Sequence, residues 1–343
     1  MWRYRELLPV MHMEDVVSLG EGMTPLLRAP AAGKRKGLKS LYIKDESRNP
    51  TQTFKARGMS VAVSMAKQLG LTKLTLATAG NAGEALAAYA ARAEIKAHIF
   101  MPRDSSPPNV LGSQLLGAKV TLVDGLIHDC AAQARSLAQG PEWFDVSTLN
   151  EPYRIEGKKS MGFELAEQLD WCLPDSIIYP TGGGSGLIGM WKAFQELQAI
   201  GWITPKLPKM FSVQAVGCSP IVQAFGSEGA RSAASQLARA NRPSGLRVPM
   251  PSGSAMIVEI LKKSGGGAVE VTEEQILGAI SEMGAAEGIF PAPEGAAGYA
   301  AIEILLRSRA IAADEKVILF NTGAGVKYLD WFEPNGSEAN CRL

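Results

Sequence analysis

Lys55 is the residue of this chain whose surroundings point most directly to chemistry. It lies in the segment NPTQTFKARG, where an Asn-Pro turn and the aromatic Phe54 precede it. A helix pattern, GMSVAVSMAKQLG, follows over residues 58–70. Partial burial lowers the pKa of an amine, and a free amine can act as a nucleophile or a base. Lys55 is therefore the first candidate for covalent catalysis.

Three glycine-containing turns occur later, at residues 79–83, 181–186 and 321–325. The second turn separates an apolar run from a helix pattern in SIIYPTGGGSGLIGMWKAF. Glycines let the backbone approach an anion closely, and the first N–H groups of the helix can bind it. A flexible tight turn is the alternative, but this context favours a phosphate cradle. The cradle would consist of Gly182, Gly183, Gly184, Ser185 and Gly186.

Nucleotide binding is a competing use of such a loop. A P-loop would end in Gly-Lys-Ser/Thr, whereas Gly186 is followed by Leu187 and Ile188. A Rossmann fingerprint would need a third glycine where Leu187 stands. The cradle and the amine of Lys55 instead favour pyridoxal phosphate, which carries one phosphate and one aldehyde.

Asn81 and Thr322 are polar residues in the first and the third of the three glycine-containing turns. Asn81 is a candidate donor to a ring hydroxyl, although an asparagine between glycines is also a common turn residue. Thr322 follows the apolar run VILF. Its hydroxyl would point into the same crevice if that strand runs parallel to the others.

Short apolar runs alternate with longer amphipathic runs along most of the chain. This alternation predicts an α/β fold with mostly parallel, twisted sheets that carry helices on both faces. The predicted strands are residues 41–44, 74–77, 97–101, 120–123, 143–146, 177–179, 211–216 and 317–320. The predicted helices are residues 58–70, 82–93, 109–116, 127–138, 159–168, 186–199, 273–287 and 295–308.

The strands fall into two groups, which predict two domains. Residues 55–150 hold four strands and form the smaller α/β domain. Residues 1–54 and 151–343 form the larger α/β domain, and the cofactor lies in the cleft between the two. Residues 227–254, rich in Ser, Ala, Gly and Pro, are predicted to form a surface crossover or an active-site flap.

The composition favours a globular protein that acts on small molecules. A formal net charge of +1 over 343 residues disfavours a nucleic-acid partner, and 46% hydrophobic residues disfavour disorder. Four scattered cysteines and three histidines predict neither a metal site nor a disulfide framework, and they favour a reducing compartment. Without a signal-peptide core or a membrane-spanning segment, we expect a cytoplasmic protein that has no membrane partner.

The motifs quoted above resemble those of the threonine synthase family. They are the segment around Lys55, the GNAG turn at residues 80–83, the GGGSG loop and the Thr-Gly pair after VILF. The similarity runs from LGEGMTPL at residues 19–26 to residue 328, nearly the whole chain. That family has fold type II of the pyridoxal phosphate enzymes, the tryptophan synthase β-like fold. The motifs are specific for this fold type and less specific for the reaction.

The resemblance implies a role for each candidate. Lys55 would attach to the cofactor aldehyde, with Phe54 packed near its stem. Asn81 would contact the ring hydroxyl, and the loop from Gly182 to Gly186 would hold the cofactor phosphate. Thr322 would face the pyridine nitrogen, where a hydroxyl in place of a carboxylate makes the ring a weaker electron sink. Such a site suits elimination and replacement more than transamination.

The family's reaction converts O-phosphohomoserine and water to L-threonine and phosphate, so the resemblance implies a small, phosphorylated amino-acid substrate. The turn that contains Thr78, Ala79, Gly80 and Ala82 would bind the α-carboxylate. Arg154, in the segment EPYRIEGK, would hold the substrate phosphate, since a planar guanidinium suits that anion. Fold-level analogy also implies a homodimer.

Several positions depart from the family pattern. Residues 52–53 are Gln-Thr where the family has Gly-Ser, and Ala56 stands in place of an aspartate. Thr148 and Leu149 stand where the family has Asn and Ser. Gly186 replaces an asparagine that contacts the substrate phosphate in many threonine synthases. The fold and the cofactor tolerate these changes, but the substrate depends on them.

Two other readings therefore remain open. The GGGSGL loop is as typical of a serine/threonine dehydratase as of a threonine synthase, and a β/γ-elimination or replacement enzyme would use the same fold. Thr322 followed by glycine differs from the serine or cysteine that is usual in the dehydratases. A non-catalytic binding or regulatory protein is the third reading, and the presence of Lys55, Asn81 and Thr322 together argues against it.

Overall fold

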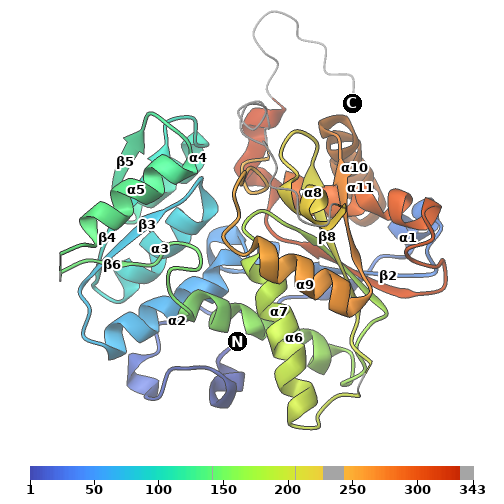
Figure 1. Ribbon diagram of the computed structural model, residues 1–343, viewed down its shortest axis with the longest axis horizontal. Helices are drawn as coiled ribbons and strands as arrows, with labels where there is room; N and C mark the ends of the chain where they lie inside the picture. Colours follow the sequence, from blue (N-terminus) through green and yellow to red (C-terminus); the bar gives the residue numbers. More distant parts are fainter. Residues whose placement is uncertain (141, 205, 227–242, 333–343) are drawn as a thin grey trace, which may run out of the picture.

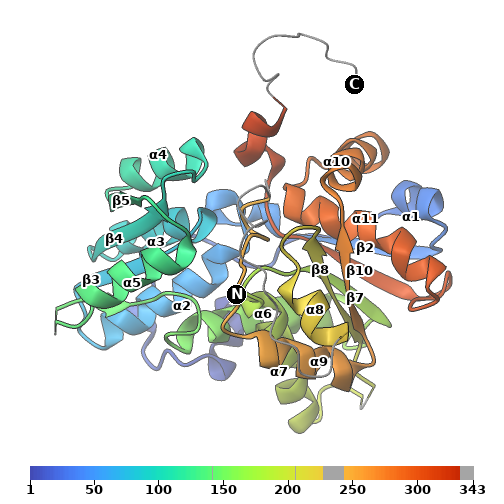
Figure 2. The ribbon, with the colours of Figure 1, turned by 45° about the horizontal axis from the view of Figure 1, so that its top comes forward.

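The computed structural model describes residues 1–140, 142–204, 206–226 and 243–332. Within these residues the chain forms two sheets with helices around them (Figure 1). The views of Figures 1 and 2 place the smaller sheet in one lobe and the larger sheet in the other. The predicted α/β class with mostly parallel sheets is confirmed.

The larger sheet has six strands in the order β1-β2-β10-β7-β8-β9. All neighbours pair in parallel except β1 with β2. The strands are β1 (Leu26–Arg28), β2 (Ser40–Asp45), β7 (Ser176–Pro180), β8 (Lys209–Ala215), β9 (Gly267–Val271) and β10 (Lys316–Asn321). Because β7 and β10 lie side by side and in parallel, the two turns that follow them open at the same edge of the sheet.

Both faces of this sheet are covered by helices, as its continuous apolar strands require. Helices α1 (Pro30–Lys36), α10 (Glu273–Glu287) and α11 (Pro293–Arg307) share one buried core with it. Helices α6 (Tyr153–Gln168), α7 (Ser185–Ala199), α8 (Pro220–Gly226) and α9 (Ser254–Ser264) contribute to the core on the other face. Phe320 of β10 and Tyr179 of β7 belong to this second core, where their rings lie 5.3 Å apart.

The smaller sheet has four parallel strands in the order β5-β4-β3-β6. Its strands are β3 (Lys73–Ala77), β4 (Lys96–Pro102), β5 (Lys119–Val123) and β6 (Phe144–Asp145). The surrounding helices are α2 (Lys55–Gln68), α3 (Asn81–Arg92), α4 (Pro107–Leu115) and α5 (Ile127–Leu137). All of these elements lie within residues 55–150, but the division of the chain into two domains at those residues remains a prediction.

Each predicted strand and helix corresponds to an observed one. Besides short 3-10 helices, five of the α-helices and strands in the described residues were missed. These are β1, β9, α1, α8 and α9. Two of the predicted helices begin three or more residues earlier than predicted. Helix α2 begins at Lys55 and not at residue 58, and α6 begins at Tyr153 and not at residue 159. Consequently Lys55, Arg154 and Lys158 all lie on helices.

Helix α6 packs closely against its neighbours α2 and α7 at glycines. A Cβ atom on Gly157 of α6 would overlap with the carbonyl oxygen of Arg57 in α2. A Cβ on Gly189 of α7 would lie 2.8 Å from the Cβ of Lys158, closer than such atoms approach. Because these positions have no side chain, the three helices pack closely. The helix ends that carry the candidate site residues are thereby brought together.

A fully buried ion network joins the same helices. The guanidinium of Arg57 donates to Glu46 at 2.6 and 2.8 Å and to Glu164 of α6 at 2.6 and 2.7 Å. Lys44 of β2 also contacts Glu164, at 3.2 Å, and all four side chains are excluded from solvent. Burial raises the pKa of Glu164, but the charge of Arg57 outweighs this effect and lowers the pKa to about 2. The network therefore holds α2, α6 and the β2 end in one fixed arrangement.

Replacing Arg57 with methionine is expected to lower the free energy of unfolding by about 3–5 kcal/mol, because Glu46 and Glu164 would remain buried without their partner. Urea denaturation measures the change. Arg48→Met is the matched control. That side chain is 70% exposed, and its partner Asp45 also accepts from Ser47 and Asn321, so the loss should be at most about 1 kcal/mol. Equal losses for the two variants would contradict the structural role of the network.

Candidate functional site

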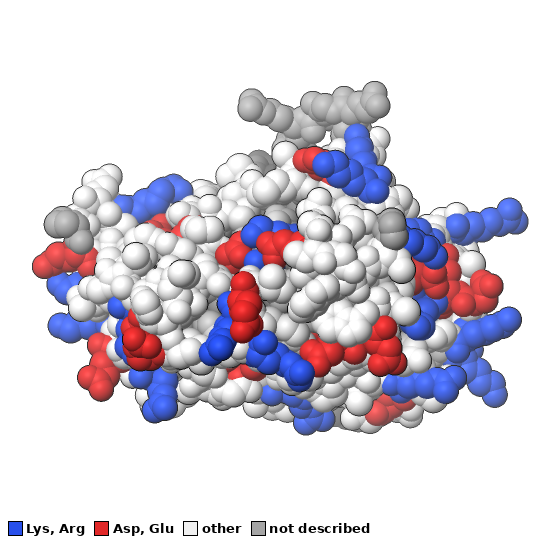
Figure 3. All heavy atoms as spheres, turned by 90° about the horizontal axis from the view of Figure 1, so that it is seen from below, with Lys and Arg blue, Asp and Glu red and all other residues white. Residues whose placement is uncertain are grey.

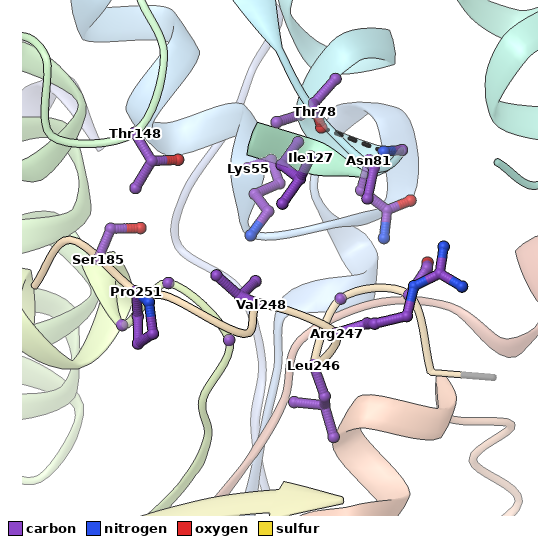
Figure 4. A pocket seen from close by; sticks show the side chains of 18 of the residues that line it. Lys55, Thr78, Asn81, Ile127, Thr148, Ser185, Leu246, Arg247, Val248 and Pro251 are labelled. Carbon is purple, nitrogen blue, oxygen red and sulfur yellow. Dashed lines mark hydrogen bonds between the residues drawn. The ribbon is translucent and has the colours of Figure 1, made fainter. Parts of the chain in front are cut away.

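A cavity of about 400 Å³ lies where the turns of both sheets and the first turn of α2 converge (Figure 4). This is an ordinary volume for a small-molecule site. Every residue predicted for the site lines it. These residues are Phe54, Lys55, Thr78, Ala79, Gly80, Asn81, Ala82, Arg154, Gly182, Gly183, Gly184, Ser185, Gly186 and Thr322. Their roles remain predictions.

Lys55 is the first residue of α2, and its amine points into the space between Ser185 and Asn81 in Figure 4. The Nζ atom lies 4.0 Å from the centre of the Phe54 ring. No carboxylate forms an ion pair with it in the part of the chain that the structure describes. Burial, followed by the charge of Arg154, lowers the pKa of Lys55 to about 7, although Glu294 acts in the opposite direction. Much of this amine is therefore unprotonated near neutral pH.

Backbone contacts hold Lys55 next to the turn after β10. The Phe54 N–H donates to the carbonyl of Thr322 at 3.1 Å, and Thr53 forms a β-bridge with Gly323. Two segments about 270 residues apart in the sequence therefore meet at one wall of the cavity. The predicted proximity of Lys55 and Thr322 depends on these two contacts.

The loop from Gly182 to Gly186 has the geometry of an anion cradle. Gly184 has a φ of 74°, a left-handed conformation that favours glycine, and a Cβ on it would overlap with Ile257. The first backbone bond of α7 runs from the Ile188 N–H to the Gly184 carbonyl. The preceding N–H groups are left over by the helix and are available to an anion at its positive end.

The turn after β3 offers a second set of donors at the start of α3. Thr78 Oγ1 accepts from the Gly80 N–H at 3.1 Å, which closes the turn. The amide of Asn81 donates to the Tyr328 hydroxyl at 2.8 Å, and that hydroxyl donates to Glu294 at 3.1 Å. Asn81 Oδ1 is buried without a partner, so the side chain retains one N–H and this oxygen for a ligand.

Arg154 is the second residue of α6, lines the cavity and is 3% exposed. Its Nη1 donates to the Val146 carbonyl at 2.8 Å, while Glu151 accepts from its backbone N–H at 3.1 Å. Burial lowers the pKa of Arg154 and raises that of Glu151. The described residues place no carboxylate in an ion pair with the guanidinium, so its charge can be matched by an anionic ligand.

The structure adds residues that the sequence did not identify. Glu294, at the start of α11, lines the cavity, and burial raises its pKa. Tyr179 also lines it, and its hydroxyl is buried without a partner. A Cβ on Gly186 would overlap with that hydroxyl. Tyr179 therefore occupies the space into which a side chain at position 186 would extend.

Ser244 to Ser252 form one wall of the cavity (Figure 4). This wall is the part of the predicted flap that the structure describes, since residues 227–242 lie outside the described residues. Arg247 from this wall forms an ion pair with Asp104, which follows β4, at 2.9 Å. The wall is therefore tied to the smaller sheet.

Clusters of potential metal ligands and membrane-spanning helices are both absent from the described residues. No group of three or more His, Cys, Asp or Glu side chains there could hold a metal ion. None of the helices described is both long enough and apolar enough to cross a bilayer. Cys341, one of the four scattered cysteines, lies outside the described residues. The surface drawn in Figure 3 shows acidic and basic side chains interspersed.

These residues fit pyridoxal phosphate. Lys55 would supply an unprotonated amine for the aldehyde, and the start of α7 would supply a cradle, where no side chain fits at Gly184 or Gly186. Asn81 Oδ1 and the Tyr179 hydroxyl are buried polar atoms without protein partners, as expected where a polar ligand completes the bonding.

Comparison with known proteins supports this assignment. Residues 17–323 match the family described as "Pyridoxal-phosphate dependent enzyme". The chain is 37% identical over 331 residues to the threonine synthase of Methanocaldococcus jannaschii, an alignment that covers 95% of this chain and 80% of that one. It is 32% identical over 325 residues to the threonine synthase of Mycobacterium leprae, with 94% and 87% covered.

Solved structures with the same fold include other lyases. Diaminopropionate ammonia lyase from Escherichia coli superposes with a TM-score of 0.77 at 19% identity, covering 94% of this chain and 92% of that one. An L-serine ammonia-lyase from Rhizomucor miehei has a TM-score of 0.74 at 18% identity, with 90% and 96% covered. At these identities the likeness concerns the fold alone, and fold type II is confirmed.

The predicted cofactor and the predicted enzyme class are likewise confirmed by the family match and by the threonine synthase relatives. These matches argue against the third interpretation of the sequence, a non-catalytic binding or regulatory protein. The chain belongs to the family of pyridoxal-phosphate dependent enzymes, in which it is a lyase similar to threonine synthases.

Proposed function

We propose that this enzyme converts O-phosphohomoserine and water to L-threonine and phosphate. The observation that carries the proposal is Arg154, a buried cation at the cavity without an ion-pair partner among the described residues. Its position suits a second phosphate in addition to that of the cofactor. The identity of 32–37% with threonine synthases over most of the chain supports the same substrate.

Lys55 is the proposed base. When bound, the cofactor withdraws electrons from the bonds at the substrate α-carbon and so acidifies its proton. With a pKa of about 7, the amine of Lys55 can take a proton from Cα or Cβ and return it. Thr322 presents a hydroxyl and not a carboxylate, which suits elimination and replacement at Cβ and Cγ.

The remaining wall residues are proposed to bind and enclose the substrate. The turn from Thr78 to Ala82 offers backbone N–H groups at the start of α3 to the α-carboxylate. Arg154 holds the substrate phosphate until it leaves. The wall from Ser244 to Ser252, tied to the smaller sheet through Arg247, limits the access of bulk water.

A dehydratase acting on serine or threonine, or a related β/γ-elimination or replacement enzyme, is the second candidate. The observation in its favour is Gly186, where Tyr179 leaves no space for a side chain that could contact a substrate phosphate. A dehydratase would release ammonia and a 2-oxo acid, whereas a replacement enzyme would retain the amino group; neither would need a phosphate ester. We further propose, by fold-level analogy, that the enzyme is a homodimer and acts in the cytoplasm.

Lys55→Ala is expected to abolish covalent attachment of the cofactor and turnover, because no other amine is proposed for the aldehyde. Borohydride reduction of the wild-type holoenzyme, followed by peptide mass spectrometry, should place the cofactor mass on the peptide containing Lys55. The control is Lys67→Ala, a lysine at the far end of the same helix. Labelling of any other lysine in the wild-type protein would show that Lys55 has been misassigned.

The rate at which the apoenzyme takes up the cofactor should fall as the pH is lowered from 8 to 5. Only the unprotonated amine attacks an aldehyde, and half of Lys55 is unprotonated near pH 7. Each further unit below the pKa reduces that fraction about tenfold. Stopped-flow absorbance at constant ionic strength gives the profile. An apparent pKa near 10, as for an exposed lysine, would contradict the proposed surroundings of the amine.

Arg154→Gln should raise KM for O-phosphohomoserine about 10–100-fold, because it removes charge-assisted hydrogen bonds of roughly 1.5–3 kcal/mol. For an unphosphorylated substrate such as serine, KM should change less than about threefold. Steady-state kinetics of the wild type and of Arg154→Gln, each with both substrates, provide the test. Equal changes for the two substrates would place the phosphate-binding group elsewhere.

A further inference from the structure

Two neighbouring lysines in α6 are both buried but have opposite surroundings. Lys159 contacts Glu156 at 2.6 Å, Glu196 at 2.8 Å and the Leu7 carbonyl at 2.7 Å. Lys158 is 0% exposed and forms no ion pair with any carboxylate in the described part of the chain. Its Nζ donates to Ser185 Oγ at 2.7 Å. The charge of one lysine is thus matched within the protein, and the charge of the other is not.

The hydrogen bond to Ser185 has a fixed direction. In its charged form Lys158 has donors and no acceptor, so the serine oxygen then accepts from it. The hydroxyl proton of Ser185 is then directed toward another acceptor. Ser185 lines the cavity at the first position of α7, so this proton is available to a ligand there.

The surroundings of Lys158 are positively charged overall. Arg154 precedes it by four residues on the same helix, and Lys55 and the start of α7 lie nearby. Burial, followed by the charges of Arg154 and Lys55, lowers the pKa of Lys158, and Glu151 only partly compensates. Burying an unpaired ammonium destabilises a fold strongly. A dianion in the cradle would supply the missing partner.

We propose that Lys158 is a positioning residue for the cofactor phosphate, which orients the Ser185 hydroxyl as a donor and supplies the buried counter-charge behind it. Lys158 itself does not line the cavity and acts through Ser185. The inference rests on the proposed role of the Gly182–Gly186 loop as the phosphate cradle. It extends that role to a lysine that precedes the loop by 24 residues.

The test compares pyridoxal phosphate with pyridoxal, which has the same aldehyde and ring but no phosphate. Dissociation constants for both are measured by absorbance with the apo forms of the full-length wild type, Lys158→Met, Ser185→Ala and the double variant. Lys158→Gln is a second variant in case the methionine side chain prevents folding. Lys159→Met is the matched control, because it removes a buried lysine whose partners all lie outside the cavity.

Lys158→Met should weaken binding of pyridoxal phosphate about 10–100-fold, as expected when a charge-assisted interaction is lost. Pyridoxal binding should change less than about threefold. The double variant should bind pyridoxal phosphate no more weakly than whichever single variant binds it less tightly, because both residues act in one chain of hydrogen bonds. The apo form of Lys158→Met should melt at the same or a higher temperature than the wild type, whereas Lys159→Met should melt lower.

An unchanged preference of both Lys158 variants for pyridoxal phosphate over pyridoxal would overturn the inference. If Ser185→Ala then still weakens pyridoxal phosphate selectively, the cradle stands and the role of Lys158 fails. If Ser185→Ala has no selective effect either, the cradle assignment itself fails. The inference would also be overturned if Lys158→Met changed only KM for a phosphorylated substrate. Lys158 would then act on the phosphate of the substrate and not on that of the cofactor.

Discussion

Arg57 occupies a fully buried position between two carboxylates that come from different parts of the chain, Glu46 and Glu164. The other features of the site depend on this arrangement. Arg57 stands two residues after Lys55 in α2, and Glu164 lies on α6, the helix that carries Arg154 and Lys158. Because breaking a buried pair strands a charge, the two helices cannot slide apart without a large loss of stability. The amine of Lys55 and the helix face that carries Arg154 and Lys158 are thereby held at a constant separation.

The contrast between paired and unpaired charges distinguishes the framework from the site. Arg57, Lys44 and Lys159 are buried cations whose charges are matched by carboxylates. By contrast, Arg154 and Lys158 are buried basic side chains that have no ion pair among the described residues; Arg154 lines the cavity, and Lys158 contacts Ser185, which lines it. A protein that keeps such charges unpaired pays in stability unless an anion is bound. The phosphate of the cofactor, and in our proposal that of the substrate, would serve this purpose.

Local patterns in the sequence predicted the strand–turn–helix units well, because apolar runs and glycine turns are encoded by neighbouring residues. The cavity could be assembled from them since parallel strands bring their carboxyl ends to one edge. Boundaries were less predictable. Placing the start of α6 at residue 159 left Lys158 off the helix, although its spacing of four residues from Arg154 would have marked a shared face. Tyr179 packs against Phe54 and Phe320, and Glu294 accepts from the Gly245 N–H; these contacts join distant parts of the chain, and no local pattern reveals them.

Two substrate classes remain as candidates, a phosphate ester and an unphosphorylated amino acid. Arg154 favours the phosphate ester, whereas Gly186 lacks a side chain that could contact it. The most direct measurement incubates the holoenzyme separately with O-phosphohomoserine, serine and threonine and quantifies phosphate, threonine, ammonia and 2-oxo acid in parallel. Our account predicts equal amounts of phosphate and threonine from O-phosphohomoserine, at a kcat/KM well above that for the other two amino acids. Ammonia and 2-oxo acid from serine or threonine, with no release of phosphate from the ester, would contradict it.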